Sequence, residues 1–152
     1  MKTLTNATDK EEILRRLQAI EPGTQRRWGK MSAHQMICHL ADGYKMYMGA
    51  KKVKPAPGIV PPAVLRWIAI WSPMPWPRGF PTVPELDQQV DGSPPAQFEA
   101  DRRELYGLLE RLTRRPRDFE WQPHPHFGQM SEESWMRLSY LHANHHLRQF
   151  GV

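Results

Sequence analysis

The sequence predicts an all-α fold: a four-helix bundle with a long Pro/Trp-rich crossover between its second and third helices. Three observations lead to this prediction. Apolar residues recur at helical spacing in four separate stretches. The alternation of apolar and polar residues that is typical of a half-buried strand is absent. Residues 55–84, between the second and third stretches, contain nine of the 15 prolines and three of the six tryptophans, so a long helix cannot run through them.

The first two helices are each predicted to begin at a capping box, in which two side chains satisfy free backbone N–H groups. Thr8-Asp9-Lys10-Glu11 opens the first helix, and Pro22-Gly23 ends it. Ser32-Ala33-His34-Gln35 opens the second helix, which is expected to run to about Gly49. The apolar stripe of the first helix comprises Ile13, Leu14, Leu17 and Ile20, and that of the second comprises Met36, Leu40, Gly43 and Tyr47. His39 lies beside the second stripe, which places it next to the core.

The proline-rich segment 55–84 is expected to be an irregular crossover with a short helix from about Pro62 to Trp71. Its apolar stretch, Ala63–Trp71, is too short to span a bilayer and carries an arginine. Loops as long and apolar as this are uncommon and often functional. We expect a lid over the core or a homodimer surface, and the alternative is a segment that contacts substrate.

Proline and serine mark the starts of the last two long helices. Ser93-Pro94-Pro95 is predicted to open the third, because proline suits the first helical turn, and Pro116 lies beyond its end. Its apolar face comprises Phe98, Leu105, Leu108, Leu109 and Leu112. Ser131 is predicted to cap the last helix, which runs to about Gln149 before Gly151. Trp135, Leu138, Ser139 and His142 share its inward-facing stripe.

The composition is that of one folded domain covering residues 1–152, with 39% hydrophobic and 24% charged residues. The single cysteine, Cys38, excludes an intramolecular disulfide. Residues 1–21 are mostly polar and do not resemble a signal peptide, so we expect a cytoplasmic protein that does not enter a membrane. The net charge of +5 comes from scattered basic pairs. This scatter argues against a nucleic-acid-binding arm.

Three of the seven histidines lie within residues 142–146. His142 and His146 are four residues apart, so on a helix their imidazoles lie one turn apart on the same face and can reach one ion. His145 also shares a face with His142, and the spacing alone does not choose between His145 and His146. The zinc-protease helix HExxH requires a glutamate where this chain has Ala143, which argues against that class.

His39, in the middle of the second helix, is the natural third ligand for such an ion. Three histidines from two helices leave coordination positions for water or substrate, which is typical of catalytic rather than structural metal sites. Imidazoles suit zinc, nickel and iron alike. Because the ligating rings must be neutral, metal binding is expected to weaken in acid.

Two stretches, "HQMICHLAD" and "YLHANHHLRQF", resemble the DinB/YfiT-like superfamily. The proteins of this superfamily are four-helix bundles that hold a divalent metal with one histidine from the second helix and an HxxxH pair from the fourth. The last helix of the family often reads H-x-x-x-H-R-G-Q. Counting back from Gln149 on that pattern assigns the metal ligands His39, His142 and His146, and leaves His145 outside the set. The stretch "HPHFG…SEESW…HHLRQFG" more closely resembles an uncharacterised DinB-related branch.

The resemblance implies a metal-dependent enzyme, because characterised members include thiol-dependent transferases and isomerases. The implied cofactors are a divalent transition metal (Zn, Ni or Fe) and a low-molecular-weight thiol that attacks an electrophile. The motif departs from the family where Leu147-Arg148 stands in place of Arg-Gly, and the segment 55–84 is a long insertion. The alternative is a non-catalytic bundle that binds a ligand or partner, with a structural or vestigial metal site.

For the other residues near these motifs we expect roles other than metal binding. Asp42 lies one turn from His39 and is expected to face solvent, with a hydrogen bond to that imidazole as the alternative. Cys38 is expected to be a small buried apolar side chain. His124 and His126 are expected to pack within their loop, with a place at the mouth of the metal site as the alternative.

Overall fold

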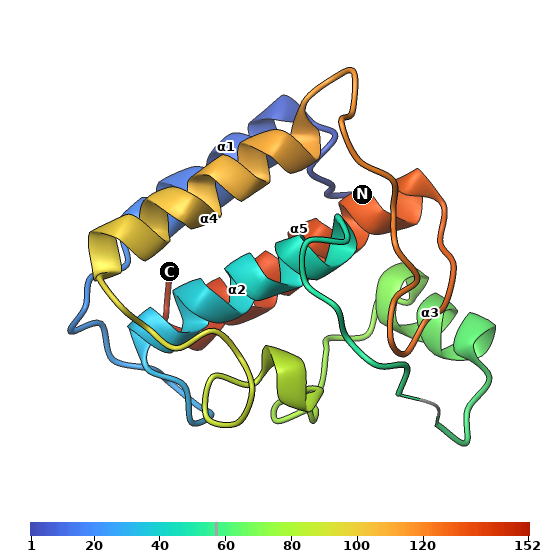
Figure 1. Cartoon of the computed structure of the whole chain (residues 1–152), viewed down its shortest axis with the longest axis horizontal. Helices are drawn as coiled ribbons and strands as arrows, with labels where there is room; N and C mark the ends of the chain where they lie inside the picture. The colour runs from blue at the N-terminus through green and yellow to red at the C-terminus, as the bar shows by residue number, and fades with distance from the viewer. Residues whose placement is uncertain (57) are drawn as a thin grey trace.

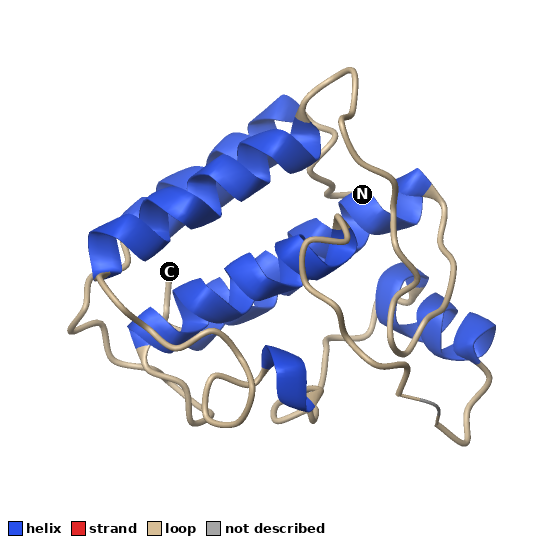
Figure 2. Cartoon of the chain, viewed as in Figure 1, coloured by secondary structure: helices blue, strands red, loops and turns tan. Residues whose placement is uncertain are grey.

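The computed structural model of the chain describes residues 1–56 and 58–152 (Figure 1). Within these residues it contains five α-helices, one short 3-10 helix and no β-strand, which confirms the all-α prediction (Figure 2). The α-helices are α1 (Ala7–Gln18), α2 (Ala33–Tyr47), α3 (Pro62–Trp71), α4 (Phe98–Thr113) and α5 (Glu132–Gln149), and the 3-10 helix is η1 (Pro84–Leu86). The short helix expected inside the proline-rich segment is therefore present as α3, with the predicted bounds.

The four longer helices, α1, α2, α4 and α5, run roughly parallel or antiparallel to one another, and α3 is set to one side (Figure 1). Helix α2 packs against α4 and α5, and α5 also packs against α1 and α3. Both predicted inward stripes are confirmed, because Met36 and Leu40 on α2 and Trp135 and Ser139 on α5 are fully buried. The facing stripes of α2 and α5 bring the predicted histidines to one place in the core.

The caps of α2 and α5 are those predicted from the sequence. Ser32 and Gln35 form a reciprocal capping box, with the Ser32 oxygen 3.1 Å from the Gln35 N–H group. The Ser131 oxygen accepts a hydrogen bond from the Ser134 N–H group at 3.3 Å. Because these caps fix where both helices begin, they set the register of the residues that follow.

The predicted starts of the other two long helices were wrong. Helix α1 begins at Ala7, because the Asn6 side chain, rather than Thr8, accepts a hydrogen bond from the Asp9 N–H group at 3.2 Å. Helix α4 begins at Phe98 rather than at Ser93-Pro94-Pro95. Ser93 is bonded instead to the buried carboxylate of Asp42, and residues 93–97 are not helical.

The crossover contributes to the core and also exposes apolar side chains. Ile70 on α3 is fully buried, and its carbonyl oxygen accepts a hydrogen bond from Arg137 on α5 at 2.6 Å. The exposed apolar residues of the segment are Ile59, Val60, Val64, Trp67, Ile68, Met74 and Phe80. None of the helices in the described parts of the chain combines the length and the apolar character that a membrane crossing requires. Through Ile70, the segment 55–84 therefore covers part of the core, as expected.

Candidate metal centre

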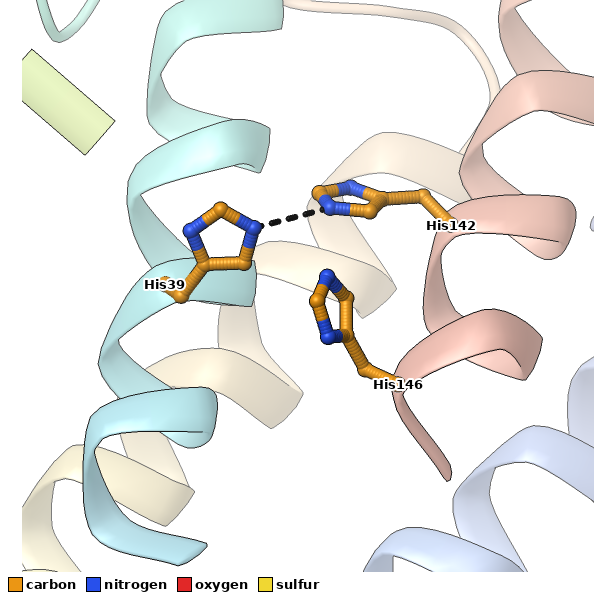
Figure 3. Close-up of side chains that lie close together, drawn as sticks. All are labelled: His39, His142 and His146. Carbon is orange, nitrogen blue, oxygen red and sulfur yellow. Dashed lines mark hydrogen bonds between the residues drawn. The ribbon is translucent and has the colours of Figure 1, made fainter. Parts of the chain in front are cut away.

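The three predicted ligands, His39, His142 and His146, lie together between α2 and α5 (Figure 3). Their ring centroids are 5.0, 4.7 and 4.9 Å apart, which is close to an equilateral triangle. One nitrogen from each ring lies within 4.8 Å of the nitrogens of the other two. His39 and the α5 pair are about a hundred residues apart in the sequence, and the packing of α2 on α5 brings them together.

The missing side chain at Gly43 lets the ring of His142 approach α2 closely. A Cβ atom at this position would lie 3.4 Å from His142 Cε1 and 3.6 Å from His142 Nδ1. Gly43 is one turn after His39 on the same helix, so it leaves space on the face that carries His39. A larger side chain there would occupy the space that the imidazole fills.

Each of the three rings is held by a second residue through its Nδ1 atom. His39 Nδ1 lies 2.8 Å from the carbonyl oxygen of Leu86, and His146 Nδ1 lies 2.9 Å from Gln149 Oε1. His142 Nδ1 lies 3.2 Å from the hydroxyl of Tyr47. Metal-binding histidines in proteins are oriented in this way by hydrogen bonds from the ring nitrogen that does not bind the ion.

Two of these partners determine which nitrogen of the ring has a free lone pair. The oxygens of Leu86 and Gln149 can only accept, so His39 and His146 donate from Nδ1 and carry the lone pair on Nε2. The Nε2 atoms of His39 and His142 are 3.0 Å apart, and the second nitrogen of His146 points toward both rings (Figure 3). Without an ion, His142 donates from Nε2 to the lone pair of His39; when its proton resides on Nδ1 instead, the lone pairs of all three rings face one another, which is the arrangement that a cation needs.

Burial lowers the pKa of all three imidazoles below the ordinary value of 6.5. Desolvation is the largest cause at each ring, and at His142 the neighbouring His146 and His39 lower the pKa further. The hydrogen bond from His39 to Leu86 and the one from His146 to Gln149 act in the opposite direction but are weaker. The rings are accordingly neutral near pH 7, the protonation state in which imidazole binds a metal.

Of the three histidines in the cluster, His142 is the most accessible to solvent. His39 and His146 are only 5% and 8% exposed, whereas His142 is partly exposed. The indole of Trp76, from the proline-rich segment, lies 6.2 Å from the His142 ring and 5.7 Å from the His145 ring. Trp76 therefore lies beside the partly exposed ring, so the segment 55–84 meets the site as well as the core.

The predicted exposure of Asp42 was wrong, and so was the alternative that it bonds His39. Its side chain is fully buried and accepts hydrogen bonds from the Ser93 N–H group at 2.7 Å and from the Ser93 hydroxyl at 2.6 Å. Gln88 donates to it at 3.0 Å, and the ammonium of Lys51 lies 3.0 Å away. Asp42 thus fastens residues 88–93 to α2, directly after the Leu86 carbonyl that orients His39.

The other histidines lie outside the cluster. His145 is partly buried, with its ring 6.2 Å from that of Trp28 and 5.2 Å from that of His146. His124 stacks on Phe127 at 4.2 Å and accepts hydrogen bonds from the backbone of its own loop, as expected. Burial lowers the pKa of His124 to about 3.

The three hydrogen-bond partners of the cluster, Leu86, Tyr47 and Gln149, were not predicted from the sequence. The Leu86 oxygen is a backbone atom, so no side-chain pattern marks it. Tyr47 was placed on the core stripe and Gln149 served only to align the last helix, although Gln149 follows His146 by three residues and is therefore one turn away. That spacing was the available signal for a residue that orients a ligand.

The fold and the site define an all-α protein with a buried cluster of three histidines. The chain belongs to the family described as "Protein of unknown function (DUF1569)", whose model matches residues 2–151. Neither the curated proteins nor the solved structures include a significant match to the chain.

Proposed function

We propose that His39, His142 and His146 bind a divalent transition metal and that the protein is a metal-dependent enzyme acting on a small molecule. The observation that carries this proposal is the pairing of each Nδ1 atom with an outer partner while the second nitrogens face one another. Three neutral nitrogen donors suit zinc, nickel or iron, and three protein ligands leave further positions for a substrate. The partial exposure of His142 supports access from that side.

The class of reaction follows from the resemblance to the DinB/YfiT-like superfamily. On this proposal α1, α2, α4 and α5 form its four-helix bundle, and a low-molecular-weight thiol is the second substrate. The metal supplies Lewis-acid chemistry that lowers the pKa of a thiol or a water. The chain itself orients the three imidazoles, keeps them neutral by burial and limits water around them with Trp76.

Metal analysis of the purified chain tests the binding part of the proposal. We expect His142→Ala to lower the transition-metal content by one equivalent per chain relative to the unaltered protein. His145→Ala is the matched control, because it removes the adjacent imidazole on the same helix and leaves the three ligands in place. Equal metal content in the two variants and in the unaltered protein would overturn the proposal.

The catalytic part is tested separately with the metal-loaded protein. We expect transfer of a low-molecular-weight thiol to a small electrophile, with maleylpyruvate-like and halogenated compounds as the first panel. His142→Ala should abolish turnover, and His145→Ala should retain it. Metal binding without turnover on any thiol and electrophile of the panel would favour the non-catalytic alternative over the thiol-transfer proposal.

A further inference from the structure

A second group of ligand-type side chains joins α2 to α4. It consists of His34 and Cys38 on α2 and Asp101 on α4. Asp101 Oδ2 lies 2.6 Å from His34 Nε2 and 3.7 Å from Cys38 Sγ, and all three donor atoms lie within 4.8 Å of one another. None of these residues belongs to the cluster of His39, His142 and His146.

The sequence places these side chains together for simple reasons. His34 and Cys38 are four residues apart, so they lie one turn apart on the same face of α2. The capping box of Ser32 and Gln35 fixes the turn that carries His34. The Ala96 N–H group donates a hydrogen bond to Asp101 Oδ2 at 3.0 Å. This bond orients the carboxylate in addition to its contacts with His34 and Cys38 on α2.

The donor set has the chemistry of a zinc site. Thiolate, imidazole and carboxylate are the three ligand types that zinc takes in proteins, and tetrahedral ligands roughly 2.1–2.3 Å from the ion lie roughly 3.5 Å from one another. The contacts of 2.6 and 3.7 Å bracket this spacing. A thiolate and a carboxylate also offset the two positive charges of the ion, so a partly buried site would carry no net charge.

An ion can reach this group from solvent. The side chains of His34 and Asp101 are 21% and 20% exposed, whereas Cys38 is 5% exposed and lies behind them. The exposed edge therefore provides entry, and the Cys38 sulfur lies at the buried edge, where burial and the Asp101 carboxylate raise its pKa to about 12 and keep it a thiol until an ion binds. A fourth position is available for a water molecule, as in other sites with three protein ligands.

We propose that His34, Cys38 and Asp101 form a second metal site, which takes Zn²⁺ and ties α2 to α4. Binding releases one proton and moves another. The Cys38 thiol loses its proton to solvent, and His34, which now donates from Nε2 to Asp101, carries its proton on Nδ1 instead. The proposal does not depend on the first site, because the two sites share no ligand.

Cobalt binding to the full-length protein tests this proposal, with Co²⁺ as a spectroscopic substitute for Zn²⁺. Cys38 is the only cysteine of the chain, so a thiolate-to-cobalt charge-transfer band in the near ultraviolet reports this site and not the three-histidine site. We expect the band to saturate when one equivalent of Co²⁺ has bound at this site, in addition to any bound by the three histidines, and to disappear on addition of Zn²⁺. It should be absent from Cys38→Ser and retained in His142→Ala, whatever the outcome at the first site.

Two further variants distinguish a built site from a thiol that binds cobalt alone. Asp101→Asn and His34→Gln should each require a higher Co²⁺ concentration to produce the band, while Asp118→Asn, an exposed carboxylate beyond the end of α4, should not. Circular dichroism confirms that each variant is folded. Absence of the band in the unaltered protein, or an unchanged cobalt titration in both Asp101→Asn and His34→Gln, would overturn the proposal.

Discussion

At the scale of single residues, the hydroxyl of Tyr47 is the one outer partner of the histidine cluster that can either donate or accept a hydrogen bond. It is 2% exposed and lies 3.2 Å from His142 Nδ1. Burial raises its pKa, so it stays a neutral phenol over the whole range in which a metal would bind. By reversing its hydrogen bond, Tyr47 lets the His142 proton reside on Nδ1 and frees Nε2 for an ion.

Tyr47→Phe is therefore expected to weaken metal binding about 10–100-fold, the usual effect of removing a hydrogen bond that orients a ligand. A titration against a chromophoric chelator measures the change. Tyr44→Phe is the matched control: Tyr44 is equally buried on the same helix, and its hydroxyl has no hydrogen-bond partner among the described residues. An equal effect of the two substitutions would show that the Tyr47 hydroxyl does not orient His142.

At the scale of secondary-structure elements, the chain after η1 is attached to α2 by one carboxylate. Asp42 accepts hydrogen bonds from Ser93 and Gln88 and pairs with Lys51. The attached stretch follows Leu86, whose carbonyl accepts the hydrogen bond of His39 Nδ1. The position of His39, a proposed metal ligand on α2, thus depends on a loop that Asp42 holds in place.

Asp42→Ala is expected to lower the free energy of unfolding by at least about 2 kcal/mol, because several hydrogen bonds to a buried charged group are lost. Metal affinity should fall as well, since the Leu86 carbonyl is no longer fixed. Urea unfolding and the chelator titration measure the two effects. Asp91→Ala, which removes an exposed carboxylate from the same loop, should change neither. A fully stable Asp42→Ala protein, or one with unchanged metal affinity, would contradict this account.

The elements also show which features a sequence can predict. Periodicity and capping residues are local, so the inward stripes of α2 and α5 and the bounds of α3 were predicted correctly. The start of α4 was not, because Ser93 is bonded to Asp42, 51 residues away, in preference to capping a helix. The burial of Asp42 was missed for the same reason. A polar residue on a helix is expected to face solvent unless its distant partners are known.

At the scale of the whole molecule, the core contains several histidines that cannot easily be charged. Burial lowers the pKa of His39, His124, His142 and His146, all of which approach the ordinary value of about 6.5 once the chain unfolds. Well above pH 6.5 these residues are neutral in both the folded and the unfolded chain. They then add no pH dependence to the free energy of unfolding. Below pH 6.5 the unfolded chain takes up protons that the folded chain does not, so the folded state loses stability as the pH falls.

The metal-free protein should therefore have a lower urea midpoint at pH 5.5 than at pH 7.5, with each buried histidine contributing up to about 1.4 kcal/mol per pH unit below 6.5. Aspartate and glutamate do not explain a loss in this window, because their ordinary pKa values lie near 3.8 and 4.5. His142→Ala removes one such group and should reduce the pH dependence, whatever its effect at pH 7.5. The same pH dependence in both proteins would show that His142 is already protonated in the folded state. Saturating Zn²⁺ should raise the urea midpoint of the unaltered protein at both pH values, because the ion binds the folded chain in preference to the unfolded one.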